Sequence, residues 1–136
     1  MMNPRQEVFA FLTQAGVYHI ATVDKDGKPH VRPFGSKQLF EDKIYVSCSI
    51  PKKVHEQLSG QKWFEISAMG EERAWVRLEG TAREVTDPAE KQRVYDDSQY
   101  GKSGGTISRA IEDVAFFELT EVSAWIFGKE TREYQW

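Results

Sequence analysis

The pattern of apolar and polar residues changes its period about sixteen residues into the chain. Before that point, apolar residues recur at helical spacing, namely Val8, Phe11, Leu12 and Ala15. Ahead of them, Asn3 is a good N-cap, Pro4 occupies the first helical position and Gln6 completes a capping box. Gly16 is a good C-terminal stop. The pattern therefore predicts a short N-terminal helix that ends just before Gly16.

Beyond the helix, runs of β-branched and aromatic residues alternate with short polar turns. They predict strands at 17–23, 28–40, 43–47, 63–68, 73–85, 115–119 and 122–127. Residues 24–27 form the turn of a hairpin. Short helices are expected at 51–58 and at 87–99, the second opened by a capping box at Asp87 and Glu90, and a loop at 101–106. This order predicts a closed, mostly antiparallel barrel with short peripheral helices, on the border of the all-β and α+β classes.

The composition fits one ordinary globular domain over residues 1–136. A single cysteine, Cys48, excludes an internal disulfide framework and agrees with a reducing compartment. No signal peptide or membrane-spanning run is visible, so we expect a cytoplasmic protein. The net charge of −3 disfavours a general role in nucleic-acid binding. Any anion site must therefore be local.

One local concentration of hydroxyls and cations stands out, between Arg32 and Lys53. The segment 32–37 reads Arg-Pro-Phe-Gly-Ser-Lys, the strand 43–47 runs on into Cys48 and Ser49, and Pro51, Lys52 and Lys53 follow at a helix start. Free N–H groups and the helix dipole attract phosphate to such a helix end. Lysine at that end is unfavourable unless an anion is bound. A solvated lysine pair on a surface turn is the alternative.

These residues resemble the FMN-binding core of the pyridoxamine 5′-phosphate oxidase-like split-barrel family. In that family an arginine and a lysine bracket the segment that lines the flavin, and Arg32 to Lys37 fits it. Val46 and Ser47 match its strand-end positions, and Lys52 with Lys53 matches its basic pair. The resemblance covers nearly the whole chain in element order and is nearest to the nitroimidazole-reductase-like branch.

The resemblance implies a role for each of these residues toward FMN. Arg32, Lys52 and Lys53 would neutralise the phosphate, and Ser47 and Ser49 would bond phosphate or ribityl oxygens. The backbone from Pro33 through Phe34 and Gly35 to Ser36 would follow the isoalloxazine edge, where Gly35 permits close approach. Lys37 and Val46 complete the cofactor set. Trp75 is expected to edge the ring and Trp125 to reach it from a partner subunit, with core or interface packing as the alternative for both.

Other chemistry is weakly indicated. The three histidines lack a third ligand at a useful spacing, so no metal site is expected. The Gly101-Lys102-Ser103 run lacks the first glycine and the preceding strand of a P-loop. No catalytic side chain is named, because hydride transfer by a flavin needs no general base.

The resemblance implies an FMN-dependent oxidoreductase that uses a small-molecule electron donor and acceptor. It also implies a homodimer with the flavin at the interface, and the four tryptophans and eight phenylalanines are compatible with that. A non-catalytic flavin-binding or sensor protein shares the same site residues. The same barrel with haem or the deazaflavin F420 is a third reading.

Overall fold

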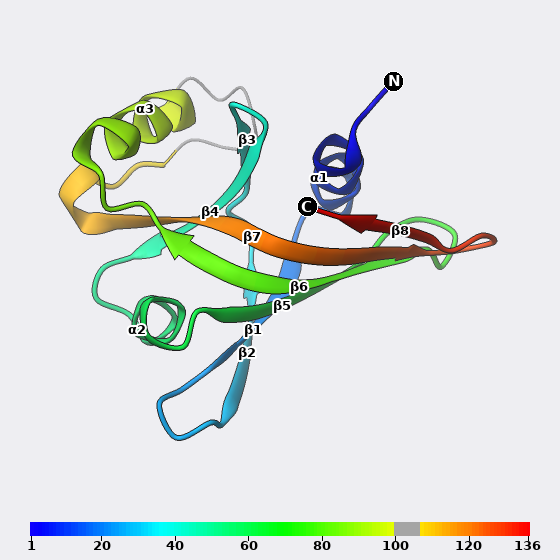
Figure 1. Ribbon diagram of the computed structural model, residues 1–136, viewed down its shortest axis with the longest axis horizontal. Coiled ribbons are helices and arrows are strands. Elements are labelled where there is room, and N and C mark those ends of the chain that lie inside the picture. The colour runs from blue at the N-terminus through cyan, green and yellow to red at the C-terminus, as the bar shows by residue number, and fades with distance from the viewer. Residues whose placement is uncertain (100–106) are drawn as a thin grey trace.

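One twisted antiparallel sheet carries the fold in the computed structural model, which describes residues 1–99 and 107–136 (Figure 1). The loop predicted at 101–106 lies outside that part. The elements follow the chain as α1 (Pro4–Ala15), β1 (Tyr18–Val23), β2 (Pro29–Phe34), β3 (Gln38–Phe40), β4 (Lys43–Ser49), α2 (Lys53–Gly60), β5 (Trp63–Met69), β6 (Trp75–Glu84), α3 (Pro88–Gln99), a 3₁₀ turn (Ile111–Asp113), β7 (Val114–Phe127) and β8 (Arg132–Gln135).

The sheet runs in the order β2-β1-β5-β6-β7-β4-β3, and β8 pairs with β7. It is open, because β2 and β3 form no ladder with each other in the described part of the chain. The prediction of a closed barrel was therefore wrong, while the mostly β fold with short helices is confirmed. β2 carries Pro29 and Pro33, which have no N–H to offer a further strand and so suit an edge.

The arrangement of the strands differs from prediction in three respects. The run 28–40 divides into β2 and β3, and the two strands predicted at 115–119 and 122–127 are one long strand, β7. A bulge makes this continuity possible: the β6–β7 register shifts between Glu79 and Thr81, opposite Glu121 at φ 51°. Gly80 sits at the bulge because a Cβ there would come within 2.6 Å of the Thr120 carbonyl oxygen. β8 had no counterpart in the prediction.

The N-terminal helix is confirmed, including its capping box. The Asn3 side chain accepts a hydrogen bond from Gln6 N at 2.9 Å, and Gln6 Oε1 accepts one from Asn3 N at 2.9 Å. Gly16 ends the helix at φ 84°, in the left-handed region that glycine adopts without strain. Val8 and Leu12 are fully buried, so α1 closes one side of the hydrophobic core.

The sheet has two faces, which the alternation of side chains along β5 and β6 distinguishes. Phe64, Ile66 and Ala68 point into the core, whereas the residues between them face outward. We call this second side of β1, β2, β5, β6 and β7 the outer face. Three large apolar residues lie exposed on it: Val31 at 68%, Trp63 at 59% and Met69 at 62%.

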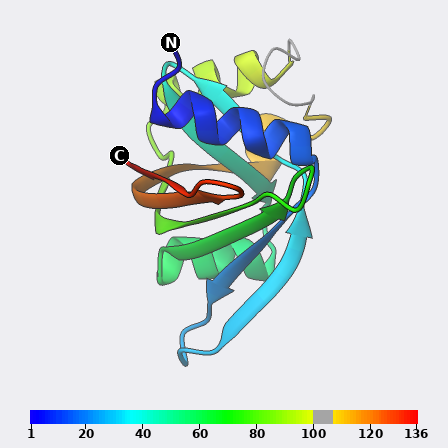
Figure 2. The ribbon, with the colours of Figure 1, turned by 90° about the vertical axis from the view of Figure 1, so that its right-hand side faces the viewer.

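The helices pack against the inner face and the β3–β4 side of the sheet. α1 and α2 lie on opposite sides of β6 and β7 in both views (Figure 2). α3 is held at the β3–β4 side by Gln38 Nε2, which donates to the Val94 carbonyl at 2.8 Å, and by an ion pair of Arg83 with Glu90 at 2.6 Å. Arg83 also pairs with Glu118 at 2.8 Å. None of these described helices has the length and hydropathy needed to cross a bilayer.

Candidate functional site

The residues between Arg32 and Lys53 gather where β4 ends and α2 begins. β4 leads through Ser47 and Ser49 to Lys52, which is the N-cap of α2. Arg32 pairs with Ile20 on β1, whose side chain is fully buried, so the arginine projects from the same, inner face of the sheet. The fold divides the predicted site residues between two cavities: Arg32 and Lys53 line one, and Ser36, Lys37 and Ser47 line the other.

The Arg32 guanidinium is held between β1 and α2. Nη1 donates to Thr22 Oγ1 at 2.6 Å and Nη2 donates to Gln57 Oε1 at 3.0 Å. Thr22 also donates a short hydrogen bond to Gln57. Partial burial lowers the pKa of Arg32, and no carboxylate among residues 1–99 and 107–136 pairs with it. The sequence did not indicate Thr22 or Gln57, which fix the direction of this cation.

The start of α2 has no side-chain cap. The side chain of the N-cap residue, Lys52, makes no capping hydrogen bond, and the first in-helix bond runs from Glu56 N to Lys52 O at 3.1 Å. The preceding N–H groups of the first turn therefore remain available to a ligand or to water. Lys53 is 86% exposed, with its nearest carboxylate, Glu56, 4.0 Å away. This helix end suits an oxyanion.

Three cations act electrostatically on Cys48 of β4. Burial raises the pKa of the Cys48 thiol to about 11, and the positive charges of Arg109, Lys52 and Arg32 oppose that rise. Glu84 reinforces it. Arg109 lies just before the 3₁₀ turn and was missed by sequence reasoning, because nothing in its spacing links it to β4. The site is thus more positive than the Arg32–Lys53 segment alone indicates.

A cavity of about 340 Å³ opens beside the segment that follows β2. Its walls include Ser36, Lys37, Ser47 and Arg109. Ser47 N donates to Ser36 Oγ at 2.7 Å, and the two hydroxyls lie 2.7 Å apart. Lys37 Nζ donates to the carbonyls of Gly16 and Gly35 at 3.0 and 3.3 Å, and burial lowers its pKa. No acid among the described residues lines this cavity, so Lys37 and Arg109 give that lining a net positive charge.

A second cavity, of about 580 Å³, lies along α2 on the side of the β1–β2 hairpin. Arg32, Lys53 and Gln57 line it together with an ion pair of His30 Nε2 and Asp24 Oδ2 at 2.8 Å. The hydrogen bond from His30, with those from backbone N–H groups, lowers the pKa of Asp24 to about 2. Arg32 and Lys53, both predicted to bind phosphate, therefore share one cavity.

The two tryptophans that were predicted to contact FMN lie away from Arg32 in the fold. Trp75 stacks on Phe127 at 4.4 Å between ring centroids, and Arg77 lies 4.9 Å above the Trp125 ring. Trp125 Nε1 donates to Glu133 at 3.0 Å. Both lie on the outer face, opposite Arg32. The residue next to each of them in its own strand points inward, and successive residues of a strand point to opposite faces. Within one chain they do not point at the Arg32 site.

Metal-ligating side chains do not contribute to this site in the described part of the chain. No group of three or more His, Cys, Asp or Glu side chains in the described residues is arranged to hold a metal ion. His55 lies 3.2 Å from Glu84, to which Ser59 also donates at 2.7 Å, so these side chains satisfy one another. The positive cluster at β4 and α2 is the chemical feature that remains.

A family profile described as pyridoxamine 5′-phosphate oxidase matches residues 4–126. The chain belongs to the pyridoxamine 5′-phosphate oxidase family. A NimC/NimA family protein from Clostridium acetobutylicum has a similar structure, with a TM-score of 0.80 and 24% identity over 97% of this chain and 93% of that one. No curated protein matched the chain.

Two further members of this structural group carry different cofactors in their descriptions. A pyridoxamine 5′-phosphate oxidase-related, FMN-binding protein from Nostoc punctiforme has a TM-score of 0.63 and 17% identity, over 97% of this chain and 89% of that one. A haem-binding protein from Mycobacterium smegmatis has a TM-score of 0.67 and 15% identity, over 99% and 59% of the two chains. At these identities the likeness shows the split-barrel fold.

Proposed function

We propose that this member of the family binds FMN and acts as an FMN-dependent oxidoreductase on small molecules. The observation that carries the proposal is the placement of Arg32 and Lys53 on one cavity along the uncapped helix α2, with Lys37 and Arg109 on a second cavity that Ser47 of β4 also lines. Phosphate is the ligand for which guanidinium groups, ammonium groups and helix N–H groups are jointly suited. The donor set therefore fits the terminal phosphate of FMN.

The remaining site residues suit the rest of that cofactor. From the phosphate, the backbone of Pro33, Phe34 and Gly35 leads to Ser36 and Lys37 at the smaller cavity. Ser47 and Ser49 offer hydroxyls along β4, and Val46 keeps the adjoining core apolar. Lys37 and Arg109 place positive charge beside this segment. When bound, FMN supplies the hydride and electron chemistry, and the protein binds and orients it.

A small-molecule acceptor with an aromatic or quinone-like ring suits a site of this size, with a reduced nicotinamide as electron donor. The working form proposed is a homodimer. Val31, Trp63 and Met69 leave an apolar outer face uncovered, and Trp75 and Trp125 lie on the same face. Pairing of two outer faces would cover these residues with the second chain, while Arg32 stays on the inner face of each chain. The single cysteine suits the cytoplasm as its compartment.

Turnover separates an enzyme from a flavin-binding sensor. Flavin-loaded protein should oxidise NADH or NADPH in the presence of a quinone, and anaerobic mixing with either nucleotide should bleach the flavin absorbance. Flavin that stays oxidised with both nucleotides would favour the sensor function instead.

Haem is the second candidate, supported by the description of the Mycobacterium smegmatis structure. Here His30 is paired with Asp24 and His55 with Glu84, which leaves the exposed His19 as the histidine without such a partner in the described residues. A haem absorbance band that a His19→Ala variant loses would support haem. Its absence, together with tight FMN binding, would exclude it.

A further inference from the structure

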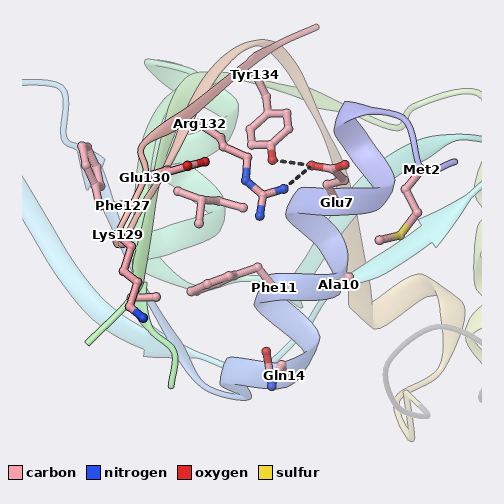
Figure 3. A pocket seen from close by; sticks show the side chains of 13 residues that line it. Met2, Glu7, Ala10, Phe11, Gln14, Phe127, Lys129, Glu130, Arg132 and Tyr134 are labelled. Atoms are coloured by element: carbon pink, nitrogen blue, oxygen red, sulfur yellow. Dashed lines mark hydrogen bonds and ion pairs between the residues drawn. The ribbon is translucent and has the colours of Figure 1, made fainter. Parts of the chain in front are cut away.

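A separate cleft lies between α1 and the β7–β8 hairpin (Figure 3). Its volume of about 610 Å³ falls in the range in which proteins bind small organic molecules. One wall is a single stripe of α1, formed by Glu7, Ala10, Phe11 and Gln14. The other wall is Ile126 and Phe127 of β7, β8 and the turn that joins the two strands. No residue assigned above to FMN lines it.

The floor of this cleft is flat and apolar. Phe11 and Ile126 both line it, and the Phe11 ring extends from α1 into the cleft (Figure 3). Gly70 lies against the tip of this ring, because a Cβ at Gly70 would come within 2.5 Å of Phe11 Cζ. Ala10, with its small side chain, lines the cleft next to Phe11. An aromatic ring can therefore lie against Phe11.

The polar side of the cleft is built around Arg132. Its Nη1 lies 3.6 Å from Glu7 Oε2, and the Tyr134 hydroxyl donates a short hydrogen bond to the same oxygen. Burial and this bond to Glu7 raise the pKa of Tyr134, so the phenol stays protonated. Glu7 and Tyr134 lie at one edge of the guanidinium, which carries five N–H donors. Arg132 thus keeps donor capacity that faces into the cleft (Figure 3).

The lining carries two acids, Glu7 and Glu130, and two cations, Lys129 and Arg132, so the donors that remain free decide which ion it takes. The carboxylate of Glu7 is already engaged by Tyr134 and Arg132, whereas Lys129 has no carboxylate within 4.0 Å among the described residues. One added negative charge would offset Lys129, while Glu7 and the nearby Glu130 would repel a second one. The site therefore suits a monoanion.

We propose that this cleft binds an aromatic monocarboxylate, with its ring on Phe11 and Ile126 and its carboxylate on Arg132 and Lys129. A planar carboxylate matches the guanidinium fork, which adds geometric selectivity to the charge. The proposal is independent of the proposed function, because the cleft shares no side chain with the site at β4 and α2.

Calorimetric titration of the full-length protein with 2-naphthoate, and with its neutral amide 2-naphthamide, tests the charge requirement. We expect naphthoate to bind and the amide to bind at least about tenfold more weakly, as loss of a charge-assisted pair predicts. In Arg132→Gln that preference should disappear, and in Lys129→Gln it should shrink. Equal binding of the two probes by the wild type would overturn the proposal.

A matched pair of tryptophan substitutions in α1 tests where the ligand binds. Ala10→Trp fills the cleft, whereas Thr13→Trp puts the same side chain on an exposed part of the helix outside the lining. With both variants shown to be folded by circular dichroism, naphthoate binding should be lost only in Ala10→Trp. Unchanged binding in Ala10→Trp, or equal loss in both variants, would place the ligand elsewhere. Saturating FMN should leave naphthoate binding unchanged.

Discussion

Replacing Arg32 with alanine should weaken FMN binding much more than riboflavin binding. The guanidinium lines the same cavity as Lys53, and it is held toward α2 by Thr22 and Gln57. A charge-assisted hydrogen bond to phosphate contributes about 1.5–3 kcal/mol, which corresponds to roughly a 10- to 150-fold rise in Kd. Riboflavin lacks the phosphate, so its Kd should change little.

The same substitution should have a modest effect on folding. Arg32 is half-buried, and its two partners already bond to each other through Thr22 Oγ1 and Gln57 Oε1. Neither buried group is therefore left unpaired when the guanidinium is removed. Urea unfolding of the apo protein supplies this control, and we expect a loss of about 1 kcal/mol or less.

The assay is fluorescence titration of apo protein, in which free flavin emission is followed as the site fills. Lys25→Ala is a matched control, because Lys25 is an exposed cation in the turn of the same β1–β2 hairpin and was not assigned to the phosphate. Equal losses of FMN and riboflavin affinity in Arg32→Ala would show that the guanidinium acts on the ring or on folding. Unchanged FMN affinity would refute the phosphate assignment.

Four further outcomes follow from particular contacts. Arg109→Gln should also raise the Kd for FMN about tenfold or more in that titration, and no change would separate Arg109 from the cofactor. Gly80→Ala should destabilise the fold by about 1–3 kcal/mol in urea because its Cβ meets the Thr120 carbonyl, whereas Gly60→Ala, with open space around it, should not. Glu90→Gln should lower the free energy of unfolding at neutral pH, because the hydrogen bond from Arg83 lowers the pKa of Glu90. The greater stability of the wild type should be complete above the ordinary glutamate pKa of about 4 and should vanish as the pH falls through the lowered value. A wild-type advantage that persists in acid would contradict this. Met69→Asp should convert the proposed dimer to a monomer in analytical ultracentrifugation, and an unaffected dimer would place the interface away from the outer face.

The local features of the fold could be predicted from the sequence because their signals are local. The Asn3 capping box and the turn at residues 24–27 each depend on a few neighbouring residues, and both form as expected. Closure of the barrel depends on whether two distant edges meet, which no short pattern states. The continuity of β7 depends on a bulge opposite Gly80, and its cause is a contact between strands.

The candidate site divides in the same way. Arg32 and Lys53 reach one cavity because the strand and the helix start that carry them follow one another closely in the chain. Arg109 reaches the other cavity, beside Ser47, from more than fifty residues away, and only the fold reveals it. The outward direction of Trp75 and Trp125 follows from strand alternation, but which chain they would face is a property of a dimer.

The central claim is that this chain holds FMN by its phosphate, and titration of the wild-type apo protein with FMN, FAD, riboflavin and haemin tests it most directly. We predict binding of one FMN per chain, with riboflavin and FAD each at least about tenfold weaker, since the cation cluster at β4 and the open start of α2 are suited to a terminal phosphate. Haemin should bind without a defined stoichiometry. Riboflavin or FAD binding as tightly as FMN, or stoichiometric haemin binding in place of flavin, would contradict the account.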